Sequence, residues 1–210
     1  MNLPLKESLD KMCEVCDLVA ERSGLKDQLE FGDDSVCSVA FKLNAFSFLA
    51  YLAAADGVLS WNECAFMGEL FDLNITPDKL RDFIAEKEIY STEFEETTPM
   101  MLQFLVAVDN AVYNSDLPIE QELGETMVNL YLAMGVGLIE SNDRSVDSMV
   151  DSERKDFETY IGMMKKYVSA NTDKHHTDLI LDFTKNGARR EKDSEKELNK
   201  GAVRAPKKKM

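Results

Sequence analysis

Residues 35–57 read SVCSVAFKLNAFSFLAYLAAADG, and this stretch decides the fold class. From Val36 to Leu52 its apolar side chains recur at intervals of three and four residues, which is the spacing of an α-helix. The pattern predicts a helix from Ser35 to Ala55, which Asp56-Gly57 ends. Because this segment is long and apolar, we expect it to form the central element of the core.

The same spacing recurs on both sides of this stretch, and no segment alternates with the period of two expected of a strand. Ten Gly and five Pro are also too few for an all-β chain, which needs frequent turns. The further predicted helices are 5–22, 60–71, 77–87, 99–114, 118–139 and 151–168, with a last short one near 179–183. We therefore expect an all-α fold, a single compact domain of seven to eight helices packed as a bundle or orthogonally.

The predicted organisation of the chain has three parts. An N-terminal helix and linker occupy residues 1–33, and the helical domain occupies 34–184. Residues 185–210 form a polar tail with ten basic and four acidic residues, which we expect to be solvated.

Local signals place the starts of several helices. Ser60 followed by Glu63 is an S-x-x-E capping box, in which the hydroxyl and the carboxylate each accept from a backbone N–H. Thr76-Pro77 and Thr98-Pro99 combine an N-cap hydroxyl with Pro at the first helical position. These pairs predict helices that begin at Pro77 and Pro99.

The charge of the chain limits its partners. The net charge is −15, and residues 1–184 carry 14 basic and 35 acidic residues, which gives −21. An acidic body of this kind disfavours binding to nucleic acid or to an anionic membrane, except through the basic tail. A linker function of the tail is an equally good interpretation.

The remaining composition indicates a cytoplasmic protein. The longest apolar run, near 46–55, is about half of what a membrane-spanning helix needs, and the N-terminal residues do not resemble a secretion signal. The four Cys are therefore expected to be reduced thiols. Cys13 and Cys16 form a C-x-x-C on a helical stripe, and a place in the core is favoured over a metal or redox site.

The loop after the central helix is the sharpest candidate for function. It reads AAADGVLSWNE, residues 53–63, and Asp56 lies at a helix C-terminus, where the macrodipole disfavours a negative charge. One interpretation is that Asp56 and Glu63 converge on Ca²⁺ or Mg²⁺, which prefer oxygen ligands. The favoured alternative is structural: Gly57 ends the first helix, and Glu63 completes the capping box of the next one.

A second acidic loop reads NDRSVDSMVDSE, residues 142–153, and occupies the corresponding place between the two later long helices. Asp143 and Glu153 are its candidate metal ligands. A solvated loop followed by an N-cap at Asp151 is the favoured alternative.

The sequence A-A-A-D-G-x-x-S-x-x-E after a long apolar helix, followed by an acidic loop and E-x-x-x-F-x-x-Y-I, resembles the TerB-like helical family. That family includes the tellurite-resistance protein TerB and the N-terminal module of DjlA-type co-chaperones. The arrangement is also similar to the helical region that precedes the ATPase module of some bacterial AAA-family proteins. The resemblance covers about residues 41–168; the first loop matches it through Asp56, Gly57, Ser60 and Glu63, whereas the second has Arg144 where the family has Gly.

The resemblance implies a non-enzymatic interaction module in stress responses, with cation-binding loops and a partner such as an AAA-type ATPase. No phosphate-binding G-x-x-x-x-G-K-[ST] occurs in the sequence, so on the AAA resemblance this chain is the sensor or adaptor part without its motor. Two alternatives stay open: a metal-dependent enzyme that uses the Asp56/Glu63 loop, and a helical adaptor with purely structural loops.

Asp109-Asn110 is a polar interruption in the middle of an apolar predicted helix. A hydrogen-bonded place in the core is favoured over a place on an interaction surface.

Overall fold

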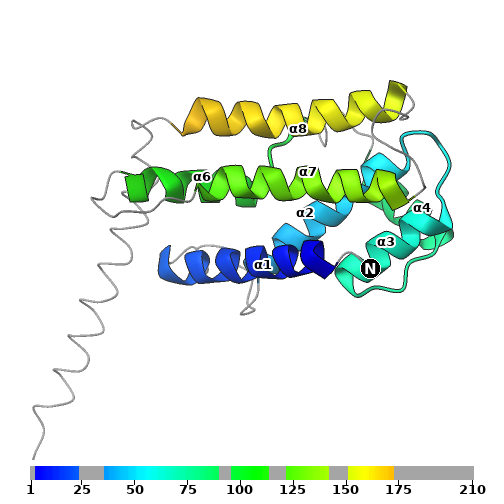
Figure 1. Cartoon of the computed structure of the whole chain (residues 1–210), viewed down its shortest axis with the longest axis horizontal. Helices are drawn as coiled ribbons and strands as arrows, with labels where there is room; N and C mark the ends of the chain where they lie inside the picture. The colour runs from blue at the N-terminus through cyan, green and yellow to red at the C-terminus, as the bar shows by residue number, and fades with distance from the viewer. Residues whose placement is uncertain (1–2, 24–35, 90–95, 114–121, 142–150, 173–210) are drawn as a thin grey trace, which may run out of the picture.

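The computed structural model describes residues 3–23, 36–89, 96–113, 122–141 and 151–172. Within these ranges the chain forms seven helices and no strand, which confirms the all-α class for this part of the chain (Figure 1). The predicted short helix near 179–183 and the basic tail lie outside the described residues. The three-part division of the chain stays a prediction.

The helices follow the predicted segments closely. They are α1 (Leu3–Ser23), α2 (Val36–Ala53), α3 (Trp61–Phe71), α4 (Pro77–Glu86), α6 (Met100–Tyr113), α7 (Leu123–Ser141) and α8 (Asp151–Asn171). None of the described helices combines the length and the hydropathy that a transmembrane span requires.

Helix α2 is the central element, as its sequence predicts. It contacts each of the other described helices. Phe41, Phe48 and Leu49 are fully buried, so the buried apolar side chains of α2 lie on more than one face of the helix. An all-round apolar helix of this kind is stable only when neighbours cover it on most sides.

Helix α7 is the second buried element. It lies between α1 and α8, and the three helices run side by side as layers in Figure 1. A Cβ built at Gly135 of α7 would lie 2.4 Å from the ring of Phe157 on α8, so glycine at this position permits the close approach of the two helices.

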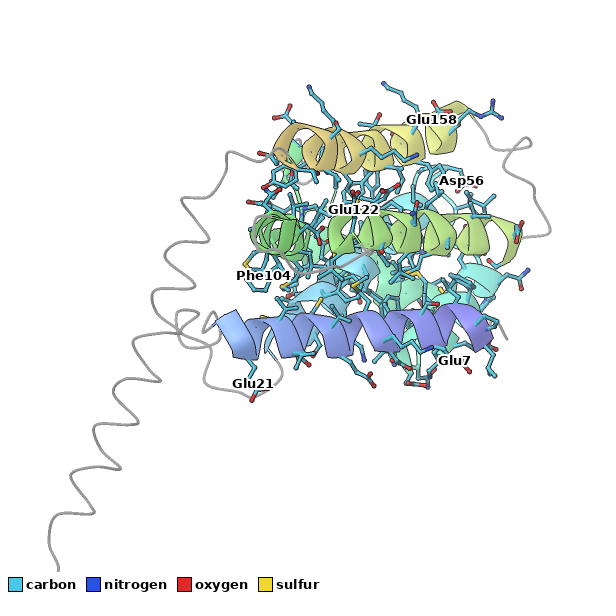
Figure 2. All side chains as sticks on the ribbon, turned by 60° about the vertical axis from the view of Figure 1, so that its left-hand side comes forward. Glu7, Glu21, Asp56, Phe104, Glu122 and Glu158 are labelled. Atoms are coloured by element: carbon cyan, nitrogen blue, oxygen red, sulfur yellow. The ribbon has the colours of Figure 1, made fainter. Side chains whose placement is uncertain are left out.

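The outer faces of the layers carry acidic side chains. Glu21 on α1 and Glu158 on α8 are exposed and point away from the body on opposite sides of the molecule (Figure 2). The negative charge of the chain is therefore displayed to solvent, and the apolar side chains fill the space between the layers.

Two neighbouring residues of α6 hold the ends of other helices. The Asp109 carboxylate accepts from the backbone N–H of Leu123 at 2.8 Å and of Gly124 at 2.7 Å, at the start of α7. The buried Asn110 donates through its amide to the carbonyl of Asn171 at 2.6 Å, at the end of α8. The prediction of a hydrogen-bonded place in the core is confirmed for Asn110, whereas Asp109 is hydrogen-bonded but only half-buried. Each side chain supplies a group that a helix end lacks.

This arrangement corrects the predicted start of α7. The sequence predicts a helix from Pro118, but Glu122 is not helical and α7 begins at Leu123. The physical reason is that the cap is supplied from α6 by Asp109, which no local signal reveals.

The predicted caps are confirmed at two helices and displaced at a third. Ser60 forms the full capping box with Glu63, and the Thr76 hydroxyl accepts from the N–H of Lys79 at 3.3 Å. Helix α6 instead begins at Met100, and the Pro99 carbonyl accepts its first helical hydrogen bond, from Gln103 at 3.1 Å. The prediction of a helix that begins at Pro99 was therefore wrong by one residue.

Candidate functional site

The loop between α2 and α3 is a tight turn that positions the first predicted ligand. Gly57 has a φ of +77°, and its N–H donates to the carbonyl of Ala54 at 3.0 Å. Asp56 lies at one end of the molecule (Figure 2), where its Oδ1 accepts from the N–H of Val58 at 2.8 Å. The carboxylate therefore closes the turn.

Glu63, the second predicted ligand, is a buried part of the capping box. Its Oε2 accepts from the N–H of Ser60 at 2.8 Å, while its own N–H donates to the Ser60 Oγ at 3.1 Å. Both carboxylates thus bind backbone groups. Among the residues that the structure describes, no three Asp, Glu, Cys or His side chains form a group able to hold a metal ion. Binding of Ca²⁺ or Mg²⁺ at Asp56 and Glu63 stays a prediction.

The second predicted pair of ligands, Asp143 and Glu153, belongs to the acidic loop at residues 142–153. Asp143 lies outside the described residues, and so does the side chain of Glu153, whose backbone belongs to α8. A cation site at these two residues stays a prediction as well.

The cysteines have the properties of core residues. Cys13, Cys16, Cys37 and Cys64 are all buried, and none of the four forms a disulfide. Burial raises the pKa of Cys13 to about 11, and burial also raises the pKa of Cys16 and of Cys64. Thiols of this kind stay protonated at neutral pH and are poor nucleophiles or ligands, so the core interpretation of Cys13 and Cys16 is confirmed.

Directly after the turn, the structure exposes an apolar surface that sequence reasoning missed. Trp61, the only Trp of the chain, is 69% exposed, and Val58 and Leu73 are 65% and 53% exposed. Trp61 and Leu73 line one shallow hollow of about 400 Å³ together with Ala65 and Gly68. We call Trp61, Ala65, Gly68 and Leu73 the Trp61 surface; Val58 is exposed in the turn three residues before Trp61.

The two sides of α3 explain why this surface is open. Cys64, Met67 and Leu70 are buried at helical spacing, so they fix the side that faces the core. Trp61, Ala65 and Gly68 recur at intervals of four and three residues and lie on the other side. The periodicity of α3 could have identified this side from sequence, because its inward stripe is complete without Trp61.

A reversal of the chain at the end of α3 brings Leu73 into the same surface. Asp72 adopts a left-handed conformation with a φ of 56°, and the N–H of Leu73 donates to the carbonyl of Gly68 at 2.9 Å. A Cβ at Gly68 would lie 2.7 Å from the carbonyl oxygen of Leu73. Glycine is therefore required at position 68 for Leu73 to fold back over the helix.

Packing on the core side keeps α3 in this orientation. The ring of Phe46 on α2 contacts the rings of Phe71 and Phe83 edge to face, with centroid separations of 5.4 and 4.9 Å. Lys6 of α1 also pairs with Asp72 at the end of α3. The Trp61 surface thus belongs to a helix that four neighbouring helices, α1, α2, α4 and α7, hold in place.

Comparison of the chain with protein-family models, with curated proteins and with solved structures finds no match. The resemblance to TerB-like proteins therefore stays a prediction, carried by Asp56, Gly57, Ser60 and Glu63.

Proposed function

We propose that this chain is a non-enzymatic helical module that binds a basic, amphipathic segment of a partner protein on the Trp61 surface. The observation that carries the proposal is the 69% exposure of Trp61, which lines one hollow with the exposed Leu73. Large apolar side chains that gather on a folded surface, in contrast to scattered ones, are typical of interaction sites.

The type of side chain supports a protein partner. Trp is enriched among the residues that contribute most to binding in protein interfaces, because it buries a large area at little entropic cost. The shallow hollow between Trp61 and Leu73 offers a place for one apolar side chain of the partner. A shallow, open surface also suits a peptide better than the enclosed site that an enzyme needs.

The charges around the surface favour a basic partner. Glu69 lines the same hollow, and Asp56 closes the turn just before Val58, whereas the charge of Asp72 is already paired with Lys6. The whole chain carries a net charge of −15. A partner segment with Lys or Arg beside its apolar side chains would therefore be attracted and oriented.

The resemblance to TerB-like modules supports the same type of function. In this proposal the chain acts as the adaptor of a stress-response complex, and a separate AAA-type ATPase supplies the partner segment. In this proposal a cation bound at Asp56 modulates binding at the adjoining Trp61 surface. Calorimetric titration of the wild type and of Asp56→Asn with Ca²⁺ tests whether Asp56 binds the cation.

The proposal predicts that a basic amphipathic peptide binds through Trp61. The probe is a labelled synthetic helix with one Lys face and one Leu face, and its fluorescence anisotropy is measured as the chain is added. We expect Trp61→Ala to weaken binding by about 2 kcal/mol, or about thirtyfold, because the anchor of the apolar contact is lost.

The matched control is Val39→Ala, which removes an exposed apolar side chain, 57% exposed, from α2. It should leave the affinity unchanged, and a peptide with Glu in place of Lys should bind far more weakly than the Lys peptide. Equal affinities of the Trp61→Ala and Val39→Ala variants would show that the peptide is held by charge alone and would overturn the proposal.

A further inference from the structure

A second hollow of the molecule, distant in sequence from the Trp61 surface, has the properties of a small-molecule pocket. It has a volume of about 360 Å³ and lies between α2, the end of α4, the start of α6 and Tyr131 of α7. Phe41, Ile89 and Met101 are buried in its wall, whereas Leu43 and Met100 are half-exposed at its edge. Ligand sites in proteins have this size and this mostly apolar lining.

The lining differs in charge from the rest of the molecule. Among the residues that the structure describes, no Asp or Glu lines this pocket. The charged residue in the described lining is Lys87, whose ammonium lies 3.2 Å from the Glu86 carboxylate at the surface. The side chain of Lys87 is about half exposed, so an anion at the edge of the pocket can approach it.

The deep end of the pocket supplies neutral hydrogen-bond donors. The Oδ1 of Asn44 accepts from the Tyr131 hydroxyl at 2.5 Å and from the Tyr160 hydroxyl at 3.3 Å. Burial raises the pKa of both tyrosines, which keeps the hydroxyls protonated as donors. Because both tyrosine hydroxyls donate to the Oδ1 of Asn44, the NH₂ group is the part of this amide that can donate to a ligand.

Ser47 lies one helical turn further along α2 and also lines the pocket. Within the described part of the chain, neither its hydroxyl nor the Asn44 NH₂ group has a hydrogen-bond partner. The described lining of the pocket therefore combines an apolar wall with hydrogen-bond donors and one cation, Lys87.

We propose that this pocket binds a small monocarboxylate with an apolar body, of the class of medium-chain fatty acids. The apolar chain lies against Phe41, Ile89 and Met101, and the carboxylate oxygens accept from Lys87 or from the Asn44 NH₂ group. This site is independent of the Trp61 surface and does not depend on the proposed function.

Octanoate is the probe that tests the site, observed by NMR of the chain labelled with ¹³C in its methionine methyl groups. Met100 and Met101 line the pocket, whereas Met67 and Met164 are buried elsewhere. We expect saturable shifts of Met100 and Met101 with little change at Met67 and Met164. Lys87→Glu should weaken binding about tenfold, because attraction at the edge is replaced by repulsion.

Three controls make the result decisive. Lys79→Glu makes the same charge change on an exposed part of α4 and should leave binding unchanged. Ala40→Phe fills the pocket and should abolish the shifts. Octylammonium has the same apolar body with a cationic head and should not bind. Equal binding of octanoate and octylammonium, or octanoate shifts without saturation, would overturn the proposal.

Discussion

Replacing Asp109 with Ala should lower the free energy of unfolding by about 2–4 kcal/mol, one of the two largest effects that we expect of a single substitution. The carboxylate accepts from the N–H groups of Leu123 and Gly124 at 2.8 and 2.7 Å. Without it, the start of α7 loses the acceptor of two amides in a partly buried position, and the contact of α6 with α7 loses its polar link. Urea unfolding measures the change.

The matched control for this substitution is Asp82→Ala, which removes the same group from an exposed position on α4. It should change the free energy of unfolding by less than about 0.5 kcal/mol. A loss for Asp109→Ala that is no larger than this would contradict the role of Asp109 as the cap of α7.

The pH dependence gives a second test of the same residue. Burial raises the pKa of Asp109 above its ordinary value of 3.8, although the two N–H donors oppose the shift. The folded state therefore binds the Asp109 proton more tightly than the unfolded state does. The contribution of Asp109 to the free energy of unfolding falls as the pH rises through the raised pKa. We expect the difference in the free energy of unfolding between the wild type and Asp109→Asn to change in favour of the variant as the pH rises from 4 towards neutrality. A change in favour of the wild type over this range would contradict the shift.

Asn44→Leu should lower the free energy of unfolding by about 2–4 kcal/mol, through a different mechanism. The substitution removes the acceptor that Tyr131 and Tyr160 share, and both tyrosines are fully buried. The Tyr131 hydroxyl then stays in the core without the acceptor at 2.5 Å, and the Tyr160 hydroxyl loses its bond to Asn44, so the cost is the desolvation of these groups. Thermal and urea unfolding of the variant measure the loss.

The triple variant Asn44→Leu, Tyr131→Phe, Tyr160→Phe separates this cost from a simple packing change. Removing all three polar groups should restore stability to within about 1 kcal/mol of the wild type, since no polar group is then left unpaired. The aromatic contacts survive, because the rings of Phe48, Tyr131 and Tyr160 pack together. A triple variant as unstable as Asn44→Leu would contradict the account.

The helices could be predicted because each depends on local sequence. The apolar spacing of residues 36–52 and the Ser60/Glu63 capping box indicate α2 and α3 within a few residues of their bounds. The start of α7 could not be predicted, because its cap comes from Asp109, which lies 14 residues before Leu123 in sequence. A long-range acceptor leaves no signal beside the helix that it caps.

The candidate sites show the same division. The sequence predicted a helix end at Asp56-Gly57 and a capping box at Ser60 and Glu63, and the structure has the turn and the capping box at these residues. The exposure of Trp61 depends on which side of α3 the core occupies, and the place of Leu73 depends on the reversal at Asp72. The pocket at Asn44 combines four segments of the chain, so sequence periodicity alone could not assemble it.

The most direct test of the proposed binding surface is acrylamide quenching of tryptophan fluorescence, because Trp61 is the only Trp of the chain. In the free folded chain the account predicts a quenching constant close to that of the urea-unfolded chain, and a marked decrease when the basic amphipathic peptide binds. A Trp61 that is already protected in the free chain, or quenching that the bound peptide leaves unchanged, would contradict it.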